Sequence, residues 1–568
     1  MRVVALVPRY HDAIVGGSEE YLRRLFRGLH GAGVDLEVFT TLDTHFHGAG
    51  PFGLRWDNAL AGQRGTGTDP FPVRRHSTLN VSAGLRRRWS DRIALAHRRA
   101  RAVPLHAGLS YLDTGFFALE RWAGDFEFRW TGAIAQFDVR GRGVSGVQLE
   151  VMALRDTRLA LAVDETPAAE ATLAAHEWTV VAAPFTARER ARVRLSVRDT
   201  VEPDGDPRAL GVAVRSVAVN TESGTEQLPL ARDRDSLLSS LTTEELAEHL
   251  DREAVTAGAW PAILESLLKG PASPSLVAAA TKAARRADLV LATNAPFVTM
   301  AQGLLVGRMA RRPVVLLPFL HLRDAAHHRW TLRHVLSRAD RVLCLSHSSC
   351  RLMERLWGTR ARFLGGGVDP QEFTGKDIDA GAFRAAHQLG TSPLVVTVAR
   401  KTPSKGYRLT CDAVRTLRER GIPCEHVLVG PDEDGLPVDP AGGRVIGARP
   451  RNEVLSALAA ADVFSLPSVY ESFGLAYLEA WMMEKPVVGH RLCDPAAELI
   501  EEGRDGLLVT DVRSTVNALE TLLSDPARRA AFGAHGRRKT LEQCTWPHVV
   551  ARALEVFAEL HPPPPRLP

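Results

Sequence analysis

The chain has 568 residues, more than one hydrophobic core accommodates, and we therefore expect several domains. With 45% hydrophobic and 24% charged residues, the composition is that of a soluble globular protein. The net charge of +5 suits anionic small molecules or an anionic membrane surface. It is too small an excess to indicate nucleic acid, and we expect no nucleic-acid partner.

The cysteines and the first residues indicate the compartment. None of the six cysteines belongs to a C-x-x-C pair, which is typical of reduced thiols in the cytosol. Met1 and Arg2 lead directly into an apolar strand and leave no room for a signal peptide. No apolar run approaches the roughly 20 residues that span a bilayer. We therefore expect a cytoplasmic protein, with any membrane contact peripheral and at the inner face of the membrane.

Residues 1–104 are predicted to begin a Rossmann-like domain. An apolar strand at 3–8, a glycine turn, a helix at 19–29 and a strand at 34–39 form a β-α-β unit, which implies a parallel sheet. Residues 84–103 are rich in arginine. A solvated helix face is the favoured interpretation of that segment, and binding of acidic lipid headgroups is the alternative.

Residues 105–222 are predicted to form an inserted antiparallel β-sandwich. The hydrophobic period changes there from helical to alternating, as at 147–151, 192–198 and 210–217. Aromatic residues gather near its start, at 116–130. Core packing is the favoured explanation for them, and a platform for a sugar ring is the alternative.

Strands and helices alternate again after the insertion. Residues 223–367 are predicted to complete the first Rossmann-like domain, 368–392 to be a linker, and 393–545 to form a second domain of the same kind. Residues 546–568 are predicted to be an amphipathic helix followed by a proline-rich tail. The expected fold class is α/β, with two Rossmann-like domains facing a cleft and the sandwich inserted in the first.

The most informative segment is 471–479. It places Glu471 in a strand-to-helix loop and Glu479 inside the following helix. A helical rise of about 1.5 Å per residue separates the two carboxylates by roughly 10 Å, too far for the paired acids of a glycoside hydrolase. The helix N-terminus between them favours a phosphate. The spacing therefore suits the polyol, diphosphate and ribose of a nucleotide sugar.

Two cations follow the first strand of the second domain. Arg400 and Lys405 lie in a loop after the strand at 394–399, at the sheet edge where ligands bind open α/β sheets. Arginine offers a bidentate fork to a phosphate and lysine a point charge. Alone, the loop could be an ordinary solvated basic segment. Paired with 471–479 in the same sheet, it indicates a phosphate site.

Histidines and glycines give weaker signals. His321 follows the strand at 313–317 and faces the expected cleft, although a lone histidine is usually structural. His327 and His328 lack a surrounding ligand set, so we expect a solvent-exposed helix start rather than a metal site. Gly16-Gly17 indicates a turn that a ligand can approach closely. Neither a G-x-G-x-x-G nor a Walker A motif occurs.

Together these residues resemble family 4 glycosyltransferases of the GT-B fold. The resemblance covers residues 1–80 and 285–560, and the insertion lies outside it. The three glycines at 365–367 depart from the Pro-Asn-Gly of many relatives, and we expect that loop to be more flexible here. The matching residues are Gly16-Gly17-Ser18-Glu19, Gly366-Gly367-Val368-Asp369, Arg400, Lys405, and Glu471 with Glu479 eight positions on.

The resemblance implies roles for individual residues. The cations would stabilise the departing diphosphate, Glu471 and the N–H groups after it would contact the donor sugar, and Glu479 would bind the ribose. It also implies retention of anomeric configuration, no cofactor, no catalytic metal, and a last helix that crosses back to the first domain. The implied catalytic set is Arg400, Lys405, Glu471 and His321, and the donor-binding set is Gly16, Gly17, Ser472, Phe473, Gly474, Leu475 and Glu479.

We therefore expect a hexosyltransferase that uses a nucleotide-diphosphate sugar. Its acceptor would be a carbohydrate or lipid-linked precursor of a polysaccharide, glycolipid or glycoside. A GT-B-fold sugar-nucleotide epimerase and a non-catalytic carbohydrate-binding scaffold that uses the insertion are the alternatives. A phosphorylase would need a lysine for pyridoxal phosphate, and no such site can be argued. The base, the sugar and the acceptor stay open.

Overall fold

The chain divides into two compact units, Met1–Ala100 with Thr243–Pro568 and Arg101–Thr242. The second unit contains the whole insertion predicted at 105–222 and extends beyond both of its ends. Gly16, and the arginine-rich segment 84–103 apart from Ala96, lie outside the described residues. The computed structural model describes residues 1–10, 17–41, 54–57, 69–76, 78–81, 96, 110–122, 126–203, 206, 208–259, 272–295 and 298–561.

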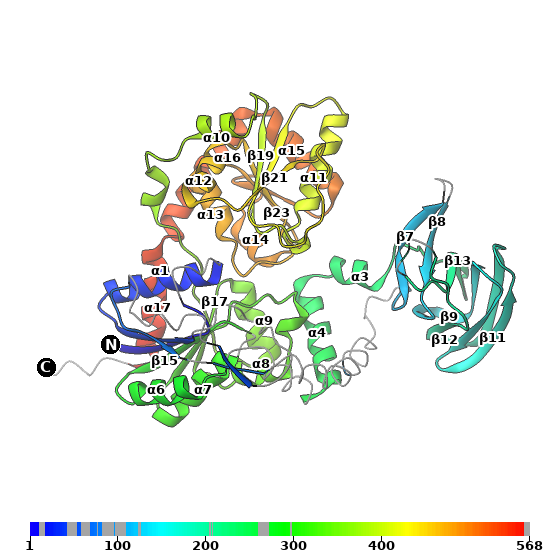
Figure 1. Ribbon diagram of the computed structural model, residues 1–568, viewed down its shortest axis with the longest axis horizontal. Coiled ribbons are helices and arrows are strands. Elements are labelled where there is room, and N and C mark those ends of the chain that lie inside the picture. The colour runs from blue at the N-terminus through cyan, green and yellow to red at the C-terminus, as the bar shows by residue number, and fades with distance from the viewer. Residues whose placement is uncertain are drawn as a thin grey trace. The chain divides into compact units, whose positions relative to one another are not determined.

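The first unit holds two parallel sheets, each the centre of one Rossmann-like domain (Figure 1). The N-terminal sheet has the strand order β18-β17-β16-β15-β1-β2-β4. Its central strands read as continuous apolar runs because helices cover both faces. The strands are β1 (Arg2–Val7), β2 (Asp35–Thr41), β4 (Val73–His76), β15 (Leu289–Thr293), β16 (Val314–Leu317), β17 (Arg341–Cys344) and β18 (Ala361–Phe363).

The two faces of this sheet belong to different cores. Val3 and Ala5 of β1 point to the side covered by the first helix, whereas Val4 and Leu6 point to the opposite side. This division follows from the alternation of side chains along a strand. The helices are α1 (Gly17–Gly31), α4 (Thr243–Ala257), α6 (Pro274–Ala284), α7 (Val298–Ala310), α8 (Trp330–Leu336) and α9 (His347–Trp357), with the 3₁₀ turn η1 (Ala325–His327).

The C-terminal sheet has six parallel strands in the order β21-β20-β19-β22-β23-β24. They are β19 (Leu394–Val398), β20 (Glu425–Val429), β21 (Arg444–Gly447), β22 (Val463–Leu466), β23 (Val487–His490) and β24 (Gly506–Val509). The connecting helices are η3 (Pro403–Lys405), α11 (Tyr407–Glu419), α12 (Arg451–Ala460), α13 (Leu475–Met482), α14 (Asp494–Leu499), α15 (Val512–Ser524) and α16 (Pro526–Gln543).

The last helix, α17 (Trp546–Leu560), belongs to the N-terminal domain by its packing. It lies against α1, where a Cβ added at Gly28 would come within 2.5 Å of the Val550 side chain. Next to its start, Val368 pairs with Thr545 in an isolated bridge. The chain therefore passes twice between the two domains, once through the segment after Val368 and once before α17.

The segment predicted as a linker, 368–392, contains two helices. The 3₁₀ helix η2 (Pro370–Thr374) is capped by Asp369, whose side chain accepts the N–H of Gln371. After it, α10 (Ala380–Ala386) packs on α12 of the C-terminal domain. Short polar stretches such as this one read as loops because their helices are too brief to show a hydrophobic period.

The second unit is an antiparallel sheet of nine strands with its own core. Two long strands, β9 (Ile134–Ala153) and β12 (Thr179–Val197), pair along most of their length. The α/β fold class is thus confirmed, and this unit has the antiparallel strand pairing that the alternating pattern predicted. The remaining elements are β6 (Tyr111–Leu112), β7 (Phe116–Trp122), β8 (Phe126–Thr131), β10 (Thr157–Val163), β11 (Thr166–Leu173), β13 (Val212–Thr221), β14 (Gly224–Gln227) and α3 (Arg234–Ser240), and in the first unit the pair β3 (Leu54–Asp57) and β5 (Thr78–Val81).

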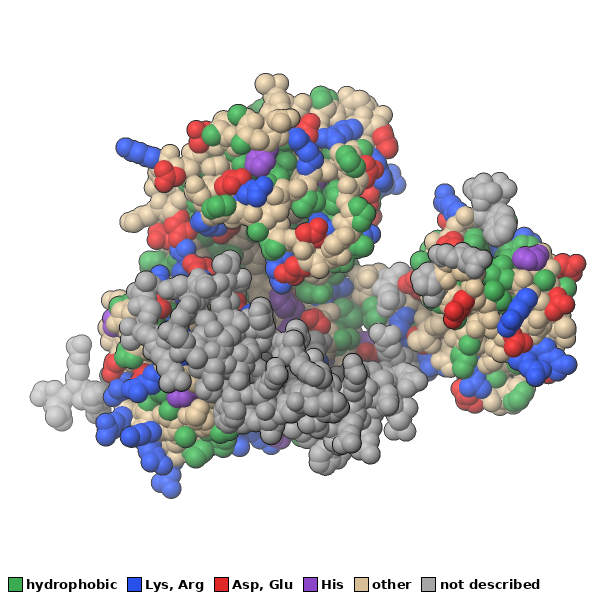
Figure 2. All heavy atoms as spheres, in the orientation of Figure 1, with side chains coloured by type: hydrophobic (Ala, Val, Ile, Leu, Met, Phe, Trp, Pro, Cys, Tyr) green, Lys and Arg blue, Asp and Glu red, His purple; other side chains and the backbone are tan. Residues whose placement is uncertain are grey.

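Charges are well mixed on the described surface that Figure 2 shows. In the view of Figure 2, basic and acidic side chains alternate over the C-terminal domain and over the inserted unit. A mixed pattern of this kind agrees with the small net charge of the chain. Among the described residues, we find no helix that combines the length and the apolar character needed to span a bilayer.

We predict that Gly533→Ala destabilises the protein, although alanine normally stabilises a helix interior by about 0.5–1 kcal/mol. A Cβ at Gly533 of α16 would lie 1.9 Å from the backbone oxygen of Glu484. The clash should lower the free energy of unfolding by about 1–3 kcal/mol, measured by denaturant titration. The control is Gly381→Ala in α10, where the nearest atom is 3.4 Å away. Equal stabilities for the two variants would contradict the packing argument.

Candidate functional site

The centre of the candidate site is an ion pair between two loops of the C-terminal domain. Lys405 ends η3, which follows β19, and Glu471 lies in the loop after β22. Because these strands are neighbours in the sheet, their following loops meet at the same edge. Lys405 Nζ lies 2.7 Å from Glu471 Oε1, and the side chains are 18% and 11% exposed. Both charges are thus largely desolvated and neutralise each other.

A glycine allows the two loops to come this close. Gly406 has a φ of +66°, and a Cβ there would lie 1.9 Å from the carbonyl oxygen of Pro467. A backbone hydrogen bond also joins the two loops, donated by the N–H of Val469 to the carbonyl of Ser404 at 2.9 Å. Any other residue at 406 would be strained and would also push the loops apart. The Lys405–Glu471 geometry therefore depends on the backbone at Gly406.

His321 approaches this pair from the N-terminal domain. It follows β16, and its Nε2 lies 3.3 Å from the hydroxyl oxygen of Ser472. Burial lowers the pKa of His321, the Glu471 carboxylate raises it, and the Lys405 ammonium lowers it. The net result is a pKa below the ordinary value, so the imidazole is neutral at pH 7. The structure thus brings His321, Lys405, Glu471 and Ser472 together.

The N-terminus of α13 opens beside Glu471 without a side-chain cap. Gly474 occupies the N-cap position with a φ of +99° and offers no side-chain oxygen to the first-turn N–H groups. Leu475 begins the helix. Phe473 is buried and packs so closely on Gly366 that a Cβ there would lie 2.4 Å from its ring. Uncapped N–H groups at a helix start favour an anion.

Arg400 lies at the edge of the site. Its side chain is 62% exposed and forms an ion pair with Glu433 at 3.2 Å, while its charge still contributes to lowering the pKa of His321. The intervening Lys401 is buried instead. Its Nζ forms ion pairs with Asp432, at 2.9 Å, and with Asp434, and these contacts hold the lysine in place. Arg400 can therefore reorient toward a ligand, whereas Lys401 is structural.

Glu479 lies one turn further along α13 and has different partners. Its Oε1 is 2.8 Å from Nη1 of Arg451, and its side chain is 19% exposed. Burial raises the pKa of Glu479, and the Arg451 guanidinium opposes this increase. No contact among the described residues joins Glu479 directly to the Lys405–Glu471 pair. The two acids are thus separate positions connected by the first turn of one helix.

The glycine turn of the N-terminal domain is only partly described. Gly17 begins α1 at the carboxyl end of β1, the sheet edge that also carries His321, and a Cβ at Gly17 would meet nothing within 4 Å. Gly16 lies outside the described residues. Within the described part of the chain, Gly17 has no recorded contact with Lys405 or Glu471.

The prediction that His327 and His328 are exposed is wrong. Both are buried, with 6% and 3% of their surfaces accessible, at the end of η1. His328 Nε2 lies 2.8 Å from the carbonyl of Leu322, and the His327 ring is 5.5 Å from that of His321. Burial lowers the pKa of His327 to about 3. Both imidazoles are neutral packing groups behind His321.

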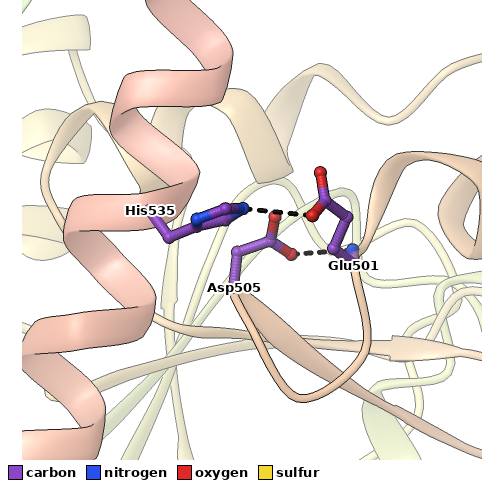
Figure 3. Close-up of side chains that lie close together, drawn as sticks. All are labelled: Glu501, Asp505 and His535. Atoms are coloured by element: carbon purple, nitrogen blue, oxygen red, sulfur yellow. Dashed lines mark hydrogen bonds and ion pairs between the residues drawn. The ribbon is translucent and has the colours of Figure 1, made fainter.

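Glu501, Asp505 and His535 also gather in space, with ligand-type atoms within 4.8 Å of one another. Figure 3 shows His535 reaching from α16 to Glu501, with Asp505 beside it. His535 Nε2 is 3.1 Å from Glu501, and Asp505 accepts the N–H of Glu501 at 2.9 Å. Lys539 Nζ pairs with Asp505 and lies 3.7 Å from Glu501. A lysine thus already pairs with both carboxylates of this cluster, which ties α16 to the loop after α14.

Side chains of both domains line cavities beside the site. One cavity, of about 170 Å³, is lined by His347 and Gly366 from the N-terminal domain and by Phe473 and Glu498 from the C-terminal domain. A smaller cavity borders Glu471. Contacts also cross between the domains, since Glu498 accepts the N–H of His347 at 2.9 Å. The domains therefore face each other across a cleft, as predicted.

Sequence reasoning missed two residues at the site. The ring of Tyr470 lies 5.6 Å from that of His321, and Arg451 holds Glu479. Tyr470 directly precedes Glu471, so adjacency could have identified it. Arg451 is one of two arginines close to the start of α12, and nothing in its spacing separates it from Arg449.

Known proteins are similar to this chain over parts of its length. The family model described as glycosyl transferases group 1 matches residues 392–525. A GDP-mannose-dependent alpha-(1-6)-phosphatidylinositol monomannoside mannosyltransferase of Mycolicibacterium smegmatis is 32% identical over 250 residues, 40% of this chain and 65% of the relative. The alpha-D-kanosaminyltransferase of Streptomyces kanamyceticus is 31% identical over 222 residues, 35% of this chain and 55% of that relative.

Solved structures give fold similarities alone. Anabaena HepE in complex with UDP and glucose shares 21% identity at a TM-score of 0.45, over 50% of this chain and 81% of that chain. TarM shares 10% identity at a TM-score of 0.48, over 98% of both chains. These scores carry no conclusion about the site. The homologous enzymes are glycosyltransferases, and the matches span less than two thirds of the first relatives' own length.

We predict that the pKa of His321 responds in opposite directions to its two charged neighbours. Lys405→Met should raise it, because the ammonium disfavours a second positive charge, and Glu471→Gln should lower it. An NMR titration of the His321 ring measures both shifts. Lys539→Met, which removes a lysine paired with Asp505, is the control and should leave His321 unchanged. Shifts of the same sign in the first two variants would disprove the proposed arrangement of charges.

Proposed function

We propose that this chain is a nucleotide-sugar-dependent hexosyltransferase related to family 4, which retains the anomeric configuration of its donor. The observation that supports this most directly is the Lys405–Glu471 ion pair beside the uncapped N-terminus of α13, with neutral His321 facing it. Each group could bind one part of a nucleotide sugar. Lys405 and the helix N-terminus suit the diphosphate, and Glu471 and His321 suit the hydroxyl groups of the sugar ring. The resemblance to glycosyl transferases group 1 over residues 392–525 favours the same function.

Charge separation is the step that the site would assist. As the glycosidic bond to the diphosphate lengthens, the sugar becomes cationic and the diphosphate gains negative charge. Lys405, reoriented Arg400 and the N–H groups after Gly474 would stabilise the leaving diphosphate, since preorganised donors act where charge develops. These groups supply positive potential without a metal, and we propose metal-independent transfer.

The carboxylate and the histidine would position the sugar. Glu471 is fixed by Lys405 and can accept a hydroxyl, and the neutral imidazole of His321 can donate or accept one. In the proposed reaction the acceptor oxygen attacks the face that the diphosphate leaves, and a departing phosphate oxygen takes its proton. Closure of the domains would exclude water from the sugar cation.

We further propose a carbohydrate or lipid-linked acceptor and a cytoplasmic location, with peripheral contact to the inner face of the membrane. The mannosyltransferase of Mycolicibacterium smegmatis, by its name, acts on a phosphatidylinositol monomannoside, which is a lipid-linked acceptor. The small positive net charge is compatible with an anionic membrane surface.

We predict that the protein slowly releases nucleotide from one of the UDP-, GDP- or ADP-sugars, and that Lys405→Ala lowers kcat/KM by about 10²–10³-fold, because a preorganised cation is lost. Lys376→Ala removes an exposed lysine and is the matched control. Coupled nucleotide release measures the rate, and NMR of the product gives its anomeric configuration. EDTA should have no effect.

Other outcomes separate the alternatives. Conversion of the nucleotide sugar to its epimer without nucleotide release would indicate an epimerase. Glycan binding with no turnover of any donor would indicate a scaffold. An inverted product would contradict retention while leaving the transferase proposal in place.

A further inference from the structure

A chain of four alternating charges runs from the N-terminal domain to Glu479. Arg24 of α1 pairs with Glu372 of η2, and Glu372 Oε2 lies 3.4 Å from Nη2 of Arg451. Arg451 Nη1 in turn lies 2.8 Å from Glu479 Oε1. The four side chains are each between 19% and 45% exposed. The network therefore connects both domains, and η2 between them, to Glu479, which is the expected contact for the ribose of the donor.

Arg451 occupies an unfavourable position unless it has a specific role. It is the first residue of α12, where the helix dipole disfavours a positive charge. Its neighbour Arg449, which precedes the helix, forms an ion pair with Glu453 of the first turn at 3.0 Å. Arg451 instead reaches away from its own helix, and its guanidinium lies 5.8 Å from the centre of the Phe373 ring. Contacts on two sides hold it in the direction of Glu479.

We propose that Arg451 is a positioning residue that keeps Glu479 ionised and oriented to accept the ribose hydroxyls of the donor nucleotide. This inference rests on the proposed function and extends it to a residue outside the 471–479 segment. The ion pair uses Oε1 of Glu479, and we assign Oε2 to the ribose hydroxyls. Glu372 and Arg24 hold Arg451 from behind, so the network connects donor binding to the junction between the domains.

The electrostatics agree with this geometry. Burial raises the pKa of Glu479, Arg451 and Arg24 lower it, and Glu372 raises it. These are the charged groups that face Glu479 from α12, α1 and η2. Without Arg451, the pKa of Glu479 should rise further. A protonated carboxyl accepts hydrogen bonds from hydroxyl groups poorly. Nucleotide affinity should therefore fall as the pH decreases toward the raised pKa of Glu479.

The experiment measures binding of UDP, GDP and ADP to the full chain by calorimetry between pH 6 and pH 8. For the nucleotide that binds, Arg451→Gln should raise Kd about tenfold, the size expected for one hydrogen bond to a charged group. The loss should grow as the pH falls. Arg451→Lys, which keeps the charge, should restore most of the affinity. In turnover, KM for the donor should rise while kcat is nearly unchanged.

Two further variants make the outcomes distinct. Arg449→Gln removes the neighbouring arginine and should change Kd less than twofold. Glu479→Gln should weaken binding at least as much as Arg451→Gln and remove its pH dependence. Weak binding in Glu479→Gln with wild-type affinity and pH profile in Arg451→Gln would overturn the role of Arg451 and leave the proposed function standing. Failure of the wild-type protein to bind any of the three nucleotides would overturn both.

Discussion

The ion pair between Lys405 and Glu471 is the interaction on which the candidate site depends. It joins the loops after two neighbouring strands, and Gly406 lets them meet. Both charges are largely buried, so removal of either would leave the other without compensation. In the proposed function, an entering diphosphate would share the ammonium of Lys405 with Glu471. The carboxylate, still held by Lys405, would accept a hydrogen bond from the donor sugar.

The two domains contribute unequal parts to this site. The C-terminal domain supplies the charges and the helix N-terminus, whereas the N-terminal domain supplies His321 and the neutral histidines behind it. Neutral imidazoles offer hydrogen bonds without adding charge next to Lys405. A positive charge there would repel the ammonium, and a negative one would compete with the diphosphate. Because their pKa values are lowered, His321 and His327 keep the side of the site that faces Lys405 uncharged.

Local signals predicted the parts of the structure that local physics determines. The strands at 313–317 and 394–399 were predicted to within one residue because continuous apolar runs between turn residues are typical of buried parallel strands. The burial of His327 and His328 could not be predicted, since it depends on tertiary packing, of His327 on His321 and of His328 on Trp357. Arg451 was missed for the same reason, because its partners are on two other elements.

Gly366 and Gly367 allow close packing where the two domains and their connecting segments meet. A Cβ at Gly367 would lie 2.8 Å from backbone atoms of Thr545 and Trp546, and one at Gly366 would strike Phe473. Glycine at these positions therefore provides space for close packing, in addition to the backbone flexibility that the sequence predicts. Gly366 lets Phe473 of the C-terminal domain approach closely, and Gly367 lets the two segments that connect the domains pack against each other. A β-carbon at Gly366 would push Phe473 away, so the approach of the two domains beside the candidate site depends on a residue that has no side chain.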